Sequence, residues 1–196
     1  MSRTTIIVLV ALGATLAGIA LSTNARRLQD DQAAPRERAA ASPQRETLGW
    51  RETFGPAGEE LVFSVETIEI LPGGWRARVG IENDTSISYE VTGPNSSLDR
   101  TFGLMLFSSG GLAELEEKNE SGTLPATRQA IRFQPELPTI LQSGESWTGT
   151  ISAPGALVAD SWVRVVFGAL VSVGMPPDEL AEHVVWITDG AYHLRA

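Results

Sequence analysis

The clearest pattern of hydrophobic and polar positions lies between residues 75 and 91. Residues 75–82 read W-R-A-R-V-G-I-E and residues 87–91 read I-S-Y-E-V, separated by a turn-like N-D-T-S. Successive strand side chains point to opposite faces, so the pattern predicts two strands, each with one buried and one solvated face. A direct hairpin would place Ile81 opposite Tyr89. If the chain instead crosses between two sheets, the alternation stands and this register does not.

A similar alternation precedes this pair, and it changes phase once. Residues 61–65 read L-V-F-S-V, whereas Ile68 and Ile70 continue on the other parity. This switch predicts a bulge or a change of sheet near Glu66–Thr67. The Pro72-Gly73-Gly74 sequence then predicts a turn into the next strand.

Further short apolar runs predict an all-β chain. Residues 102–107 read F-G-L-M-L-F, which is typical of a central strand covered on both faces. Residues 130–133, 146–152 and 162–170 also have strand character, whereas residues 112–117 fit a strand or a helical turn. Seven or more short strands with little helix indicate an antiparallel β-sandwich.

Near the C-terminus, Asp189-Gly190 predicts a two-residue hairpin. In that register Val185 and Ile187 join Tyr192 and Leu194 on the core face, while Trp186 and His193 share the other face. Either another strand covers this second face, or it forms a small binding patch for a partner. Trp186 and His193 are therefore the candidate binding residues.

The N-terminal segment is apolar and long enough to cross a membrane. No charge lies between Arg3 and Arg26, and a helix over this stretch would span roughly 33 Å against a hydrocarbon core of about 30 Å. It is either a retained anchor or a signal peptide cleaved after residues 23–25. The two arginines at 26–27 lie on the side that the positive-inside rule disfavours for an exported domain.

Composition divides the chain and excludes some chemistry. Residues 1–25 are the predicted anchor or signal, residues 26–47 a flexible Ala-, Arg- and Pro-rich linker, and residues 48–196 the β-sandwich domain. The formal charge of −9 disfavours nucleic acid as a partner, because an acidic domain repels phosphates. With no cysteine, disulfides and thiolate sites are excluded.

The motifs point to no catalytic, cofactor or metal site. The only histidines, His183 and His193, fall on opposite faces of the predicted hairpin and would not share an ion. No serine stands in a G-x-S-x-G elbow. The carboxylates of residues 114–117 have no separation fixed by the sequence, so they do not define a glycosidase pair.

Three segments resemble those of bacterial immunoglobulin-like domains that an N-terminal helix holds outside the membrane. They read W-R-A-R-V-G-I-E-N, S-G-E-S-W-T-G-T-I and W-V-R-V-V-F-G. The resemblance implies an immunoglobulin-like β-sandwich but carries no functional residue, and the Cys–Trp–Cys pattern of antibody domains is missing.

The function expected on these grounds is that of a non-catalytic binding domain of the cell envelope. Its N-terminal helix would contact the membrane, and its partner would be a protein. It would face the extracytoplasmic side, or be secreted if the N-terminal segment is cleaved. The alternative is a secreted enzyme or inhibitor with its site in the sandwich loops.

Overall fold

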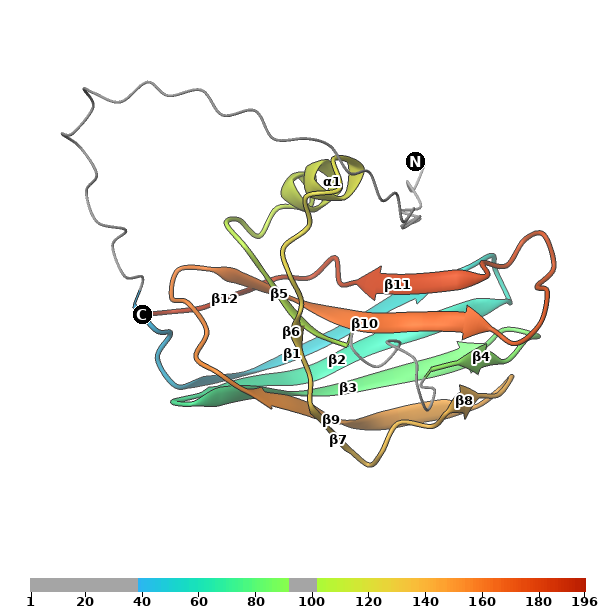
Figure 1. Ribbon diagram of the computed structural model, residues 1–196, viewed down its shortest axis with the longest axis horizontal. Helices are drawn as coiled ribbons and strands as arrows, with labels where there is room; N and C mark the ends of the chain where they lie inside the picture. The colour runs from blue at the N-terminus through green and yellow to red at the C-terminus, as the bar shows by residue number, and fades with distance from the viewer. Residues whose placement is uncertain (1–38, 92–101) are drawn as a thin grey trace, which may run out of the picture.

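The computed structural model describes residues 39–91 and 102–196, which form two antiparallel sheets and one short helix (Figure 1). The predicted N-terminal helix, its cleavage site, most of the linker and the loop at 92–101 lie outside these residues. Sheet one has the strand order β1-β2-β3-β9-β7. Its strands are β1 (Gln44–Phe54), β2 (Glu60–Leu71), β3 (Gly74–Asp84), β9 (Ser146–Pro154) and β7 (Arg132–Gln134).

Sheet two is organised around its long central strand, β10. This strand pairs with β5 and β4 along one edge and with β12 and β11 along the other, while β6 and β8 pair with β5 and β4. The strands are β4 (Tyr89–Glu90), β5 (Gly103–Phe107), β6 (Arg128–Gln129), β8 (Ile140–Leu141), β10 (Trp162–Ser172), β11 (His183–Ile187) and β12 (Tyr192–His193).

The alternation at residues 75–91 correctly predicts which side chains are buried and which are exposed. Between its two halves the chain crosses from one sheet to the other. Val79 is fully buried in β3, whereas Arg78 beside it is exposed. Strand β4 pairs with β10 and β8 in sheet two instead of with β3. The crossing alternative is therefore confirmed, and the direct hairpin register does not form.

The phase change in β2 is a bulge, as predicted. The register between β2 and β3 shifts between Val65 and Thr67, which keeps both Ile68 and Ile70 buried. The predicted turn also forms, since Leu71 pairs with Gly74 across Pro72-Gly73. Strand β1 begins at Gln44, so strand structure extends into the segment that the composition assigns to the linker.

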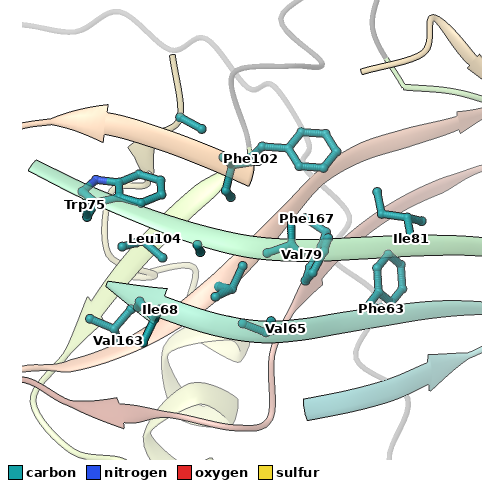
Figure 2. Close-up of a cluster of buried hydrophobic side chains, with 14 of the residues drawn as sticks. Phe63, Val65, Ile68, Trp75, Val79, Ile81, Phe102, Leu104, Val163 and Phe167 are labelled. Atoms are coloured by element: carbon teal, nitrogen blue, oxygen red, sulfur yellow. The ribbon is translucent and has the colours of Figure 1, made fainter. Parts of the chain in front are cut away.

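One apolar core lies between the inner faces of the two sheets, an arrangement compatible with a β-sandwich (Figure 2). Phe63 of sheet one meets Phe167 of sheet two with ring centroids 5.0 Å apart, and Phe102 contacts Phe167 edge-on at 6.5 Å. Burial of these side chains against one another ties the sheets together, because apolar area removed from water contributes about 25 cal/mol per Å².

A second, smaller apolar cluster lies on the outer face of sheet two, under α1 (Leu112–Glu120). Leu115 of the helix packs with Met105 and Phe107 of β5 and with Val166 of β10. Strand β5 is thus covered on both faces, as its continuous apolar run predicts, and the ambiguous residues 112–117 are helical. In the described part of the chain no helix is long and apolar enough to span a bilayer.

The predicted C-terminal hairpin is wrong. Val166 of β10 pairs with Ile187 of β11, and Val163 pairs with Tyr192 of β12, so both strands run antiparallel to β10, one after the other. Asp189-Gly190 therefore interrupts an extended chain instead of reversing it.

The faces of β11 also differ from those predicted for the hairpin. Val184 and Trp186 pack on the core between the sheets, whereas Val185 and Ile187 pack on the cluster under α1. Farther along, Tyr192 and Leu194 belong to the core, as predicted.

Candidate functional site

Trp186, the first candidate binding residue, is held by contacts within the fold. Its ring stacks on Phe63 at 5.4 Å between centroids and meets Phe54 at 6.0 Å. Its indole Nε1–H donates a 2.7 Å hydrogen bond to a carboxylate oxygen of Glu52. These contacts give Trp186 a packing role at the edge between the sheets, and a binding role for it stays a prediction.

His193, the second candidate, lies in another part of sheet two. It pairs with Trp162, and the two rings are 4.8 Å apart, whereas Trp186 pairs with Phe167. The positions of Trp162 and Phe167 on β10 are about 16 Å apart at roughly 3.3 Å per residue. The structure therefore does not bring Trp186 and His193 together in one patch.

A carboxylate holds the segment between β11 and β12 from the side of sheet one. The Glu52 carboxylate accepts hydrogen bonds from the backbone N–H groups of Asp189 and Gly190, each 3.0 Å long. Gly190 also lies against the ring of Trp50, where an added Cβ would stand 2.6 Å from ring carbons. Gly190 is thus required by close approach, and its φ is not positive.

Arg164 holds the same segment from the side of sheet two. Its guanidinium, fully buried, donates to the carbonyls of Thr188 (2.8 Å) and Asp189, and to those of Gly110 and Gly111 (3.0 Å each). Burial lowers the pKa of Arg164, while the nearby carboxylates oppose that shift. Sequence reasoning missed this role, because a single arginine in an apolar strand does not reveal which loops will cover it.

Glu114 secures the start of α1, next to the loop that covers Arg164. Its partly buried carboxylate accepts hydrogen bonds from the Ser108 hydroxyl (2.6 Å), the Ser108 N–H (3.1 Å) and the Ser109 N–H (2.6 Å). Burial raises the pKa of Glu114, but these hydrogen bonds outweigh burial and lower it to about 2. A carboxylate so fully occupied is a structural acceptor, and it does not have the raised pKa expected of a general acid.

The outer face of sheet one carries the arrangement best suited to binding. The strand registers place one residue from each of the five strands in a continuous line across the sheet. We call this line the basic row; its members are Arg45, Glu69, Arg76, Ser152 and Arg132. Three guanidinium groups face one carboxylate, so the row is net positive in a protein of charge −9.

A groove of about 520 Å³ runs along β9 and crosses the basic row. Its lining comes from the β2–β3 turn, from residues 131–134 and from the last part of β9, with no acidic side chain among the lining residues. On β9, Ser152 lies between Arg76 of β3 and Arg132 of β7, and Thr150 lies between Arg78 and Gln134 of the same two strands. Strands β3 and β7, on either side of β9, are roughly 10 Å apart at about 4.8 Å per strand. Short side chains flanked by long ones thus create the concave surface.

Arg132 differs from three other arginines on this face in having no ion-pair partner. Arg51 pairs with Glu82, Arg78 with Glu66 and Arg76 with Glu69, at nitrogen–oxygen distances of 2.6–2.8 Å. No such contact is made by Arg132 within residues 39–91 and 102–196. The hydrogen bond from Arg76, opposed by burial, lowers the pKa of Glu69, and Arg45 adds a weaker charge interaction in the same direction. The direct contacts of this carboxylate are with Arg76. Of the two arginines that line the groove, Arg132 is therefore the one available to a ligand.

The groove can bind an anion or an extended chain, and its residue types do not suggest proton transfer. Apolar surface accompanies the charge, since Ile131 is 62% exposed and Leu71 is 37% exposed at its rim. Among the described residues no group of three or more His, Cys, Asp or Glu side chains is placed to hold a metal ion. Alternation could have shown that Arg76 and Arg132 face solvent, but not that they share one groove.

Comparison of the chain with protein families, curated proteins and solved structures finds no match. The functional inference therefore depends on the sequence and the geometry of this chain.

Proposed function

We propose that this protein is a non-catalytic binding domain of the bacterial cell envelope, and that it docks a protein partner in the groove of sheet one. The observation that carries the proposal is the unpaired Arg132 at a concave, net-positive part of an otherwise acidic molecule. An unpaired guanidinium costs little in water, yet it offers five donors to a partner that arrives with a carboxylate.

The apolar rim supports a protein as the partner. Ile131 and Leu71 present aliphatic surface beside the charge. Protein interfaces commonly combine an apolar centre with hydrogen-bonding groups around it. The groove is open and lies on a sheet face, which suits a chain segment better than an enclosed small molecule.

The placement of the domain belongs to the same proposal. The apolar segment at residues 6–21 would tether it to the membrane with the β domain on the extracytoplasmic side, or would direct secretion if it is cleaved. The kinship with bacterial immunoglobulin-like domains is supported by the two-sheet arrangement and by the crossing between β3 and β4. The β1-β2-β3 order within one sheet differs from that of antibody constant domains, in which the third strand lies in the second sheet.

Site-specific crosslinking in the cells that produce the protein tests this function. Ile131, at the groove, is replaced by photoreactive p-benzoyl-phenylalanine in the full chain, and Leu112, which is 45% exposed on α1, is replaced in a matched control. We expect one protein adduct at position 131, absent at position 112 and lost when Thr150→Trp fills the groove. The adduct should sediment with membranes, and replacement of residues 1–38 by a cleavable export signal should release it.

Two results would contradict the function. Identical adducts at positions 131 and 112 would show that contact is not specific to the groove. An adduct that persists in Thr150→Trp, with unchanged thermal melting, would place the partner elsewhere.

A further inference from the structure

We propose that the groove recognises an extended acidic peptide segment in which a carboxylate lies two residues away from an aliphatic side chain. This inference rests on the proposed function and names the chemistry of the partner segment. It follows from the way in which the outer face of sheet one is layered along the strand direction.

Three successive layers of outward-facing residues line or border the groove. The end layer is apolar, with Leu71, Gly74 and Pro154 paired across β2, β3 and β9. Next comes the basic row, and beyond it a third layer in which Thr150 lies between Gln134 and Arg78. Residues two apart on a strand are about 6.6 Å apart, so the layers repeat at that interval.

An extended ligand chain has the same repeat. Side chains at positions i and i+2 of a strand-like peptide point the same way and are also about 6.6 Å apart. A peptide lying along β9 could therefore set an aliphatic side chain on the end layer and a carboxylate between Arg132 and Arg76. The side chain after the next would reach the hydroxyl and amide of Thr150 and Gln134.

The direction of the groove favours a peptide over an anionic polysaccharide. The β9 part of its lining runs from Thr150 to Pro154, roughly 13 Å along the strand, which is enough for about five extended residues. A charged polymer that followed the basic row would instead run across the strands from Arg45 to Arg132. The groove does not extend there, since neither Arg45 nor Glu69 lines it.

Charge selects the ligand at one position. Glu69 satisfies Arg76 through a 2.8 Å hydrogen bond, so Arg132 supplies most of the free donor capacity. An exposed ion pair of this kind contributes about 0.2–1 kcal/mol, so replacing the carboxylate by an amide should weaken binding by about 1.4- to fivefold.

Blocked synthetic peptides test the spacing and the charge separately. The probe is Ac-Leu-Ser-Glu-Ser-Leu-NH2, which presents the same spacing in either direction. Ac-Leu-Ser-Gln-Ser-Leu-NH2 removes the charge, and Ac-Leu-Glu-Ser-Ser-Leu-NH2 moves it to the other face. Binding to the full chain in neutral detergent micelles is followed by amide shifts in NMR spectra. We expect shifts at residues 131–134 and 150–154, with both control peptides weaker by about 1.4- to fivefold.

Two arginine variants assign the effect. Arg132→Gln should abolish the difference between the glutamate and glutamine peptides. Arg51→Gln, on the same face and paired with Glu82 away from the groove, should preserve it.

Three outcomes would overturn the inference: equal binding of all three peptides, an equal effect of the two arginine variants, or polygalacturonate shifting amides across the whole basic row. The inference and the proposed function can fail separately. A position-131 adduct without peptide selectivity would leave the docking site standing and remove only the assigned chemistry.

Discussion

The outer faces of the two sheets both carry arginine, and the surroundings of the two side chains are opposite. Arg164 of sheet two is fully buried beneath two loops and donates to four backbone carbonyls. Arg132 of sheet one is exposed and has no ion-pair partner among the described residues. Arginine on the outer face of a sheet thus has a structural role at Arg164 and is available to a ligand at Arg132.

The difference lies in what covers each face. Helix α1 and the segment at 188–191 close over the centre of sheet two, so its outer face is apolar around the guanidinium, which lies 5.4 Å from the centre of the Phe107 ring. The outer face of sheet one is instead polar and open to solvent, with cross-strand ion pairs and with the hydroxyl groups of β9. Removing one partner of a buried hydrogen bond leaves the other partner unsatisfied. The resulting loss in the free energy of unfolding is far larger than for the same change in water.

The largest expected effect tests this comparison directly. Arg164→Met should lower the free energy of unfolding by about 3–4 kcal/mol, because it leaves several carbonyls without a donor in a dry site. Arg132→Met should change it by less than about 0.5 kcal/mol. Urea unfolding of the two variants measures both values, and similar losses would show that the contrast between the faces is false.

A second prediction concerns the segment that covers Arg164. Gly190→Ala should destabilise the protein by about 2–3 kcal/mol, because the new Cβ would stand 2.6 Å from the ring of Trp50. Gly73→Ala is the control, since no atom lies within 4 Å of its added Cβ. Thermal melting compares the two. A neutral Gly190→Ala would mean that the segment does not pack against Trp50.

The smallest expected effect is a loss of stability at low pH, caused by protonation of Glu114 beside the loop that covers Arg164. The pKa of Glu114 is about 2 in the folded protein and about 4.5 as a reference, so its contribution to stability is present above pH 4.5 and lost as the pH falls toward 2. The free energy of unfolding should fall by about 2 kcal/mol over that interval from this group. Glu114→Gln should remove that part of the pH dependence in urea titrations at pH 5 and pH 2.5.

A control at the other end of α1 makes the pH result specific. Ser121→Ala removes a hydrogen bond to the Glu117 carbonyl and introduces no charge. It should lower the whole stability profile without changing its slope. A parallel loss of slope in both variants would mean that fraying of the helix, and not Glu114, causes the pH dependence.

Local patterns predicted several elements well. Alternation identified the faces of β3, the change of parity located the bulge between Val65 and Thr67, and the apolar run of β5 indicated burial on both sides. The Asp189-Gly190 hairpin failed, although the dipeptide is a strong turn former. Glu52, well over a hundred residues away in the chain, and Arg164 hold the segment between β11 and β12 so that the chain continues along β10 without reversing.

The sequence by itself determined which side of β3 faces the core and where β2 changes phase, because side chains alternate along any extended chain and apolar ones must leave water. It also determined the acidity of the molecule and the lack of disulfides. Only the tertiary structure decided that Arg45, Arg76 and Arg132 share one row and that Arg164 lies beneath loops. The reason is that alternation is local, whereas the choice of neighbouring strand depends on pairing and packing between segments distant in the chain.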